Sequence, residues 1–295
     1  MPCSAVTLSV ATICAIIATT LLAIAFSSDN WLYYEVKRNK IQTFAATHSD
    51  SDSLLSSMNS KYFYYTRTRG LFRICYPKER PPSASVPTYL SPLETQCSNI
   101  DYFPHTQDEK TLDNDIISRL HLARSCVALF IISFVAIFCS FWTGLSGCWK
   151  RSSGAITATS ILLLTACLLA AGAMGLWHTM EFFEKEKIVG EDYYQQWNMI
   201  LRDNTKLSYD WSYILAWCGV GSCLAAAILL SGAAICLKSE REKEEQLNLQ
   251  YLMPAAVKLF YSQKQPPYPP YVNYSQPQVY SGPYYHGSQY GPYNY

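Results

Sequence analysis

Four long apolar runs, separated by polar segments, dominate the pattern of the chain. They cover Ala5–Phe26, Ser125–Cys148, Ala155–Trp177 and Trp211–Leu237. Each has roughly 20 or more residues with few or no charges, enough for a helix to cross a hydrocarbon layer of about 30 Å. Because lipid offers no hydrogen-bond partner to the backbone, a spanning segment is expected to be helical. The pattern therefore predicts an α-helical membrane protein with four transmembrane helices.

The lysines and arginines of the short links set the predicted orientation. Lys150 and Arg151 lie between the second and third runs, and Lys238 follows the fourth, so both of these segments should be cytoplasmic. The predicted organisation is a cytoplasmic N-terminus at 1–4, spans at 5–26, 121–148, 155–177 and 211–237, outer loops at 27–120 and 178–210, a cytoplasmic loop at 149–154, and a mostly disordered cytoplasmic tail at 238–295.

An alternative for the first run is a cleaved signal peptide. Ala23-Ile24-Ala25 resembles a small-x-small cleavage site after an apolar stretch. We favour a retained span, because the stretch is long for a signal sequence and the first four residues carry no lysine or arginine. Cleavage would move the N-terminus outside and leave the other three spans unchanged.

The long first outer loop contains short aromatic and β-branched segments. Those at 31–34, 61–65 and 70–75 are typical of strands, whereas Ser49–Ser60 and Pro77–Pro92 are expected to be irregular. The aromatic second loop is expected to extend the third span before it turns. After the fourth span, alternating acids and bases predict a helix broken at Pro254, and the Tyr- and Pro-rich remainder a disordered tail.

Composition excludes several classes of function. Charged residues make up 15% of the chain and the net charge is +1, which gives no basis for nucleic-acid binding. The five histidines have no metal-ligand spacing, and no nucleophile, phosphate-binding or dinucleotide motif occurs. We therefore expect neither an enzyme nor a protein with a cofactor or metal site.

Most of the 11 cysteines lie in the apolar runs, where cysteine is a small packing residue. Only Cys75 and Cys97 lie in an outer loop, which faces an oxidising compartment. We expect them to form a disulfide, which is worth about 3 kcal/mol for a loop of this size. Cys3, Cys148 and Cys236 are candidates for palmitoylation at the cytoplasmic face.

The tail contains a proline–tyrosine segment, Pro266-Pro267-Tyr268-Pro269-Pro270-Tyr271. Its PxxP spacing suits an SH3 groove, and its tyrosines are candidates for phosphorylation. The aromatic C-terminus would be a weak ligand for a PDZ scaffold, and a simple spacer remains the alternative reading. The sequon at Asn273 lies in this tail and should carry no glycan if the tail is cytoplasmic.

The loop residues form a pattern that resembles the claudin superfamily. That family carries a Trp after the first span, then Gly-Leu-Trp-x-x-Cys, a second Cys and an Arg that opens the second span. The matching residues are Trp31, Gly70, Leu71, Phe72, Cys75, Cys97 and Arg124. Phe72 departs from the family's Trp; its ring can still pack, but a role specific to indole would be lost. Arg124 taken alone is expected to pair with an acid or a lipid head group, or to extend to the interface.

Within the superfamily, two segments are similar to the calcium-channel gamma and stargazin-like branch, including the germ-cell-specific-gene-like proteins. They are Cys97–Pro104 and Ser208–Trp217. The resemblance implies a left-handed four-helix bundle topped by an antiparallel sheet of about five strands. The tail lacks the PDZ-binding ending of stargazin-type proteins.

The resemblance implies an auxiliary subunit of an ion channel or receptor in the plasma membrane, and the alternative is a claudin-like barrier or adhesion protein at cell–cell junctions. A membrane-organising role like that of peripheral myelin protein is a third reading. The expected partners are membrane lipid and another integral membrane protein or a second copy of the chain. The small-residue stretches Ala170–Gly175 and Gly219–Ala227 are candidates for the lateral contact.

Overall fold

The computed structural model describes residues 3–47, 51–82, 96–103, 113–150, 152–190 and 192–262. The chain divides into two compact units, Met1–Glu242 and Lys243–Tyr295. The helix bundle, the sheet and the candidate site all belong to the first unit. The proline–tyrosine segment and the C-terminal residues lie outside the described residues.

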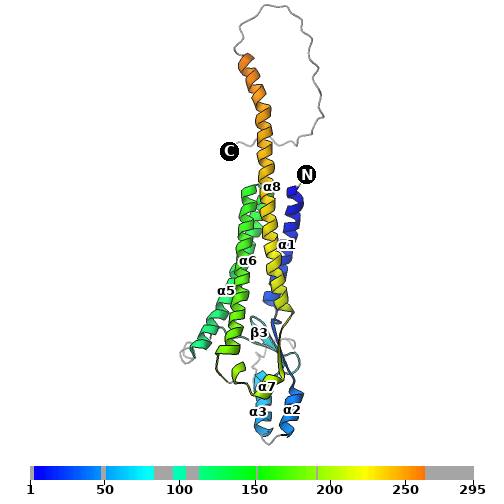
Figure 1. Cartoon of the computed structure of the whole chain (residues 1–295), viewed down its shortest axis with the longest axis vertical. Helices are drawn as coiled ribbons and strands as arrows, with labels where there is room; N and C mark the ends of the chain where they lie inside the picture. The colour runs from blue at the N-terminus through cyan, green and yellow to red at the C-terminus, as the bar shows by residue number, and fades with distance from the viewer. Residues whose placement is uncertain are drawn as a thin grey trace, which may run out of the picture. The chain divides into compact units, whose positions relative to one another are not determined.

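Four long helices form the bundle (Figure 1). They are α1 (Cys3–Ser27), α5 (Asn114–Lys150), α6 (Ser153–Phe182) and α8 (Trp211–Ser262). Each contains a stretch long and apolar enough to cross a membrane. Together with the small sheet described below, they confirm the predicted fold class.

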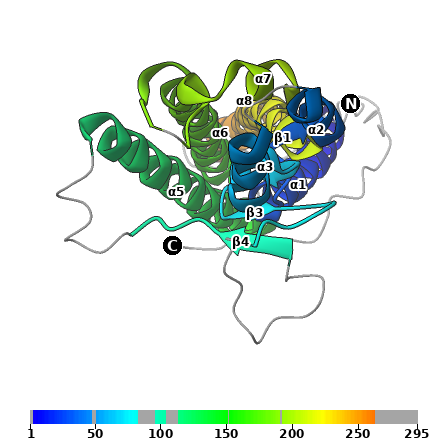
Figure 2. The ribbon, with the colours of Figure 1, turned by 90° about the horizontal axis from the view of Figure 1, so that it is seen from below.

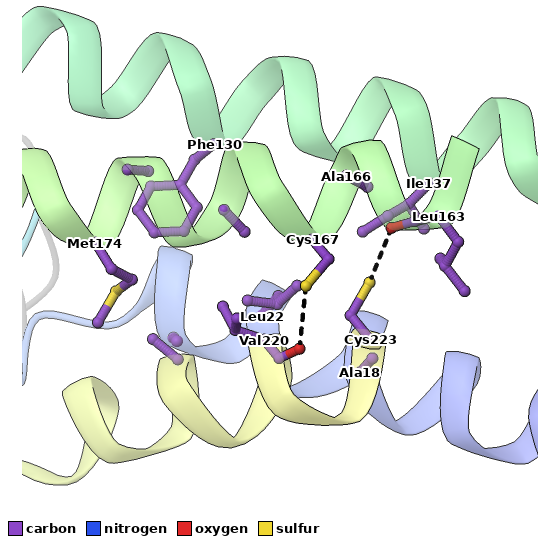
Figure 3. Close-up of a cluster of buried hydrophobic side chains, with 14 of the residues drawn as sticks. Ala18, Leu22, Phe130, Ile137, Leu163, Ala166, Cys167, Met174, Val220 and Cys223 are labelled. Atoms are coloured by element: carbon purple, nitrogen blue, oxygen red, sulfur yellow. Dashed lines mark hydrogen bonds between the residues drawn. The ribbon is translucent and has the colours of Figure 1, made fainter. Parts of the chain in front are cut away.

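The bundle core is built mainly from small side chains, which let the helix backbones approach closely (Figure 3). Polar groups in this core reach across to neighbouring helices. The Ser133 hydroxyl donates to the Ala166 carbonyl at 2.8 Å, and Cys167 Sγ lies 3.5 Å from the carbonyl oxygen of Val220. The buried cysteines Cys126, Cys167 and Cys223 therefore act as packing residues with weak internal hydrogen bonds.

The small-residue stretches proposed for lateral contact serve largely for internal packing. Ala170 and Ala173 are fully buried within the bundle. A Cβ added to Gly219 would lie 2.8 Å from Cγ of Leu22, so α8 and α1 need a glycine there to pack. The prediction that these stretches face a partner is wrong for their buried positions. There the small residues fill the contacts between the four helices of the bundle and cannot reach another protein.

An antiparallel sheet of five strands lies at the end of the bundle opposite the start of α1 (Figure 1). Its order is β4-β3-β2-β1-β5, and Figure 2 shows β4 at an outer edge. The strands are β1 (Leu32–Val36), β2 (Arg67–Arg69), β3 (Arg73–Cys75), β4 (Cys97–Asn99) and β5 (Thr205–Tyr209). β5 comes from the second loop and pairs with β1 from Leu32↔Tyr209 to Val36↔Thr205. The two loops therefore share one sheet.

Two helices, α2 (Arg38–Thr47) and α3 (Ser51–Ser60), are inserted between β1 and β2. The expectation that Ser49–Ser60 is irregular is therefore wrong from Ser51 onward. Ile41, Ala45 and Met58 are almost completely buried, and Ile41 and Ala45 are spaced as one face of a helix. Burial of these faces outweighs the weak helix preference of serine.

The sequence-based expectations for three other segments have mixed outcomes. The segment at 61–65 is not a strand but contains a short 3₁₀ helix, η1 (Tyr62–Tyr64). The extension of the third span is confirmed: α6 continues into a π-helical turn, η3 (Phe183–Lys187), before η4 (Tyr194–Gln196) and α7 (Met199–Asp203). The break at Pro254 is wrong, because α8 is continuous to Ser262. A proline removes one backbone donor, and here the helix continues past that loss.

Candidate functional site

A disulfide between Cys75 and Cys97 joins β3 to β4. The two residues are also register partners in the antiparallel pair. The bond confirms the pairing expected from the sequence, and it closes a loop with a sequence separation of 22. Asp29 lies close to both sulfurs, but the sulfurs are bonded to each other and are therefore not free thiolate ligands for a metal.

Trp31 connects the sheet to the bundle. It is completely buried, and its indole N–H donates to the Ala25 carbonyl near the end of α1 at 2.7 Å. Its ring packs against Phe130 of α5 and Trp177 of α6, with centroids 5.9 and 5.0 Å away. One side chain thus holds three helices against the start of β1. These contacts also make α1 an integral part of the bundle.

The Gly70–Phe72 turn lies tightly against the segment after α1. A Cβ at Gly70 would be 2.5 Å from Cα of Asp29, so only glycine fits there. Leu71 is buried in the bundle cluster, and the Phe72 ring meets Phe26 edge-on with centroids 5.0 Å apart. Phe72 therefore packs as an aromatic ring, as expected from the sequence.

Arg124 of α5 contacts the residues that follow β4, Tyr102 and Phe103. Its Nε donates to the Tyr102 carbonyl at 2.8 Å, and its guanidinium carbon lies 5.0 Å from the ring centroid of Phe103. The Tyr102 hydroxyl in turn donates to the Leu71 carbonyl. Arg124 therefore organises the loop beside it, a role that its sequence position alone did not indicate.

A buried ion cluster joins the sheet, α5 and the second loop. The Glu184 carboxylate on η3 accepts hydrogen bonds from Arg69 of β2 and, at 2.6 Å, from Arg119 of α5. All three side chains are at most 17% exposed. Such a cluster favours one arrangement of these elements, because removing a single partner would leave a buried charge uncompensated.

The electrostatics of this cluster follow from burial opposed by two cations. Burial alone would raise the pKa of the Glu184 carboxyl, but the charges of Arg69 and Arg119 and their hydrogen bonds outweigh it and lower that pKa to about 2. Glu184 is therefore ionised at neutral pH. A neighbouring carboxylate, Glu181, pairs with Lys185 and accepts a hydrogen bond of 2.8 Å from the Tyr209 hydroxyl on β5.

Comparison with known protein families gives one match that covers most of the chain. The family described as PMP-22/EMP/MP20/Claudin tight junction matches residues 16–232. The chain belongs to this family. A search of curated proteins found no match. The family range includes all five strands and the whole sheet-to-bundle connection of this claudin-family protein, and it ends within α8.

Sequence reasoning missed the ion cluster of this claudin-family protein. Arg69 and Glu184 are separated by 115 positions, and no local pattern marks them as partners. The only signal was an acid-rich second loop set against arginines flanking the second span. Predicting this ion pair would require knowledge of the strand register that places Arg69 and of the π-helical turn that places Glu184.

The remaining candidate residues lie apart from the sheet. Cys148 is exposed and Cys236 is half-buried, and both stay predicted palmitoylation sites. Cys3 begins α1, but its side chain is not among those described. The tail segment at 266–271 also lies outside the described residues, so its binding to an SH3 domain stays a prediction.

Proposed function

We propose that this claudin-family protein is a non-enzymatic auxiliary subunit that binds an ion channel or receptor laterally in the plasma membrane, with both termini in the cytoplasm. The similarity of 97–104 and 208–217 to the calcium-channel gamma and stargazin-like branch supports this choice. The structural argument for this function is the way Arg124 of α5 holds Tyr102 and Phe103 of the first segment.

The observation that carries the proposal is an exposed aromatic side chain held in place at the junction of sheet and bundle. Phe103 is 77% exposed, although it follows a segment fixed by hydrogen bonds. The carbonyl of the preceding Tyr102 accepts a hydrogen bond from Arg124, and its hydroxyl donates to the Leu71 carbonyl. The Arg124 guanidinium also lies against the Phe103 ring. A preordered aromatic residue costs little entropy on binding and is typical of the residues that dominate interface energies.

Co-expression in isolated cells tests the proposal. The full chain is expressed with a voltage-gated calcium channel or with an ionotropic glutamate receptor, and co-purification and gating are measured. We expect binding and altered gating with at least one partner, and we expect Phe103→Ala to reduce both. Loss of an interface aromatic costs about 2 kcal/mol or more, or roughly a thirtyfold loss of affinity.

Phe44→Ala is the matched control. Phe44 is also an exposed phenylalanine, 37% accessible, but it lies on α2 at the far end of the sheet domain, which we define as residues 28–103 and 183–210. It should leave co-purification unchanged. Absence of any channel or receptor partner, or equal effects of both substitutions, would contradict the proposed lateral subunit.

A junction protein is the second candidate, and the position of α2 and α3 favours it. These helices lie at the end of the sheet domain farthest from the bundle (Figure 1), where a protein on a neighbouring cell would be met. Expression alone in cells that lack junctions separates the two functions. Continuous strands at cell contacts, without any effect on channel gating, would support the junctional role.

A further inference from the structure

A polar cavity of about 340 Å³ lies between the sheet, the start of α5 and the second loop. Its size is within the range of about 300–1,000 Å³ that is common for small-molecule sites. Its charged lining residues are Arg67, Arg69, Asp101, Arg119, Glu184, Lys185 and Asp192.

Two buried arginines form the positively charged part of this cavity. Arg67 and Arg69 are only 5% and 9% exposed. Nη1 of Arg67 donates to the carbonyls of Phe63 and Tyr65 at 3.1 and 3.4 Å, and in the described part of the chain this arginine makes no ion pair. Arg69 shares Glu184 with Arg119, and its Nε is buried without a hydrogen-bond partner among the described residues.

The acids of the lining do not balance this charge where it is buried. Asp101 and Asp192 are exposed, and Asp101 accepts a hydrogen bond of 2.9 Å from the backbone N–H of Phe103. The cavity lining thus carries three guanidinium groups and one buried carboxylate, Glu184, which pairs with Arg69 and Arg119 but not with Arg67. Because an uncompensated buried cation is costly, an anion in this cavity would be stabilised by the site.

Aromatic side chains surround Arg67 and complete the site. Its guanidinium carbon lies 4.1 Å from the Tyr34 ring centroid and 5.6 Å from that of Trp197. The hydroxyls of Tyr34 and Tyr62 have no hydrogen-bond partner in the part of the chain that the structure describes. Burial raises the pKa of Tyr62 to about 12, so its hydroxyl stays protonated and can donate to an anion at neutral pH.

We propose that this cavity binds a carboxylate whose oxygens are held by Arg67 and Arg69, while the aromatic rings cover its apolar part. The planar guanidinium fork matches a carboxylate in shape and charge. The carboxylate comes either from a free small molecule or from an acidic side chain of a partner protein. The proposal goes beyond the proposed function, since it holds for a channel subunit and for a junction protein alike.

Calorimetric titration of the purified full chain tests the binding. The probe is sodium benzoate, and its neutral isostere benzamide is the control ligand. Because a hydrogen bond to a charged group contributes about 1.5–3 kcal/mol, benzamide should bind at least tenfold more weakly. Arg67→Gln should weaken benzoate binding by the same factor.

Arg38→Gln is the matched control variant. Arg38 also lies over a tyrosine, 4.0 Å from the Tyr65 centroid, but it does not line this cavity. It should leave the affinity for benzoate unchanged. If Arg67→Gln fails to fold, Tyr62→Phe removes only one hydroxyl and should still weaken binding, by about threefold to tenfold.

Two peptides distinguish the sources of the carboxylate. N-acetyl-Phe-Glu-Phe-amide is compared with the same peptide carrying Gln. Preferential binding of the Glu peptide supports an acidic side chain of a partner, whereas binding of benzoate without binding of the peptide supports a free small molecule. The proposal would be overturned if benzoate bound no better than benzamide and the Glu peptide no better than the Gln peptide. It would also be overturned if both Arg67→Gln and Tyr62→Phe left the affinity for benzoate unchanged.

Discussion

Gly70 shows how closely the sheet approaches the bundle at a single residue. The positions that a Cβ would meet belong to the backbone of Ser28 and Asp29, which cannot move aside as a side chain does. The same turn places Leu71 in the bundle cluster and the Phe72 ring against α1. Substitutions here should therefore disturb both parts of the fold.

The first prediction concerns Gly70→Ala. The added methyl group would force a backbone shift, and such overpacking costs about 1–3 kcal/mol. We expect a lower thermal midpoint, measured by intrinsic tryptophan fluorescence of the purified protein. Gly221→Ala is the control, because a Cβ at Gly221 would have no neighbour within 4 Å. Equal midpoints for the two variants would contradict the close approach.

The second prediction concerns the pH dependence contributed by Glu184. Its pKa is lowered from 4.5 to about 2 in the folded protein, so its ionised form stabilises the fold above about pH 4.5. That contribution should be lost as the pH falls from about 4.5 to about 2. Glu184→Gln removes it, so the difference in thermal midpoint between the native protein and the variant should shrink over this interval.

Glu186→Gln provides the comparison for this pH series. Glu186 lies on the same π-helical turn, but its side chain is exposed. We expect its midpoint to follow that of the native protein at every pH. A constant difference between native protein and Glu184→Gln down to pH 2 would refute the role assigned to the cluster.

At the level of elements, α2 and α3 are held to the sheet by a small second cluster of buried side chains. Ile41 and Met58 lie in it with Tyr34, Phe63 and Trp197. This cluster is separate from the bundle core, so the inserted helices depend on the sheet domain for their burial. Isolated helices of 10 residues are marginal in water, and packing must therefore supply their stability.

The third prediction concerns Ile41→Ala. Truncating a fully buried isoleucine lowers the free energy of unfolding by about 2–5 kcal/mol. The destabilisation should mainly affect α2 and α3. We expect faster tryptic cleavage within 37–61, measured by mass spectrometry, before the bundle unfolds. Phe44→Ala on the same helix should be cleaved at the native rate, since Phe44 is exposed. Equal rates for the two variants would argue against this packing.

The elements also show which features could be predicted from the sequence. The four spans were evident because about 20 apolar residues have few alternatives to a membrane helix. The cystine was evident because two cysteines alone lay in an outer loop. In contrast, α3 was hidden by its serines, and β5 was missed because its partner strand, β1, lies more than 160 positions earlier. Strand pairing of that kind depends on the tertiary fold rather than on local sequence.

At the level of the whole molecule, the sequence predicts that both termini are cytoplasmic and that the loop at 27–120 lies outside. The fourth prediction is that epitope tags at both termini are hidden on intact cells and accessible after permeabilisation. A tag inserted after Ser49 should be accessible in both conditions, because it lies in the predicted outer loop. The lysine and arginine bias of the short links is the physical reason.

The glycosylation state of Asn273 gives an independent check of this topology. Asn273 should carry no glycan if the tail is cytoplasmic, and digestion with a glycosidase should leave the electrophoretic mobility unchanged. Tags accessible at either terminus of intact cells would contradict the orientation, although the four-helix fold itself would stand.

The pairing of β5 with β1 has a consequence for protein engineering. Chimeras between related proteins are usually cut so that one loop at a time is exchanged. In this molecule such a cut would place strands of different origin side by side and would divide the Arg69–Glu184 pair between two parents. A graft that keeps its shape should transplant 28–103 and 183–210 together and should retain Arg119, the second partner of Glu184.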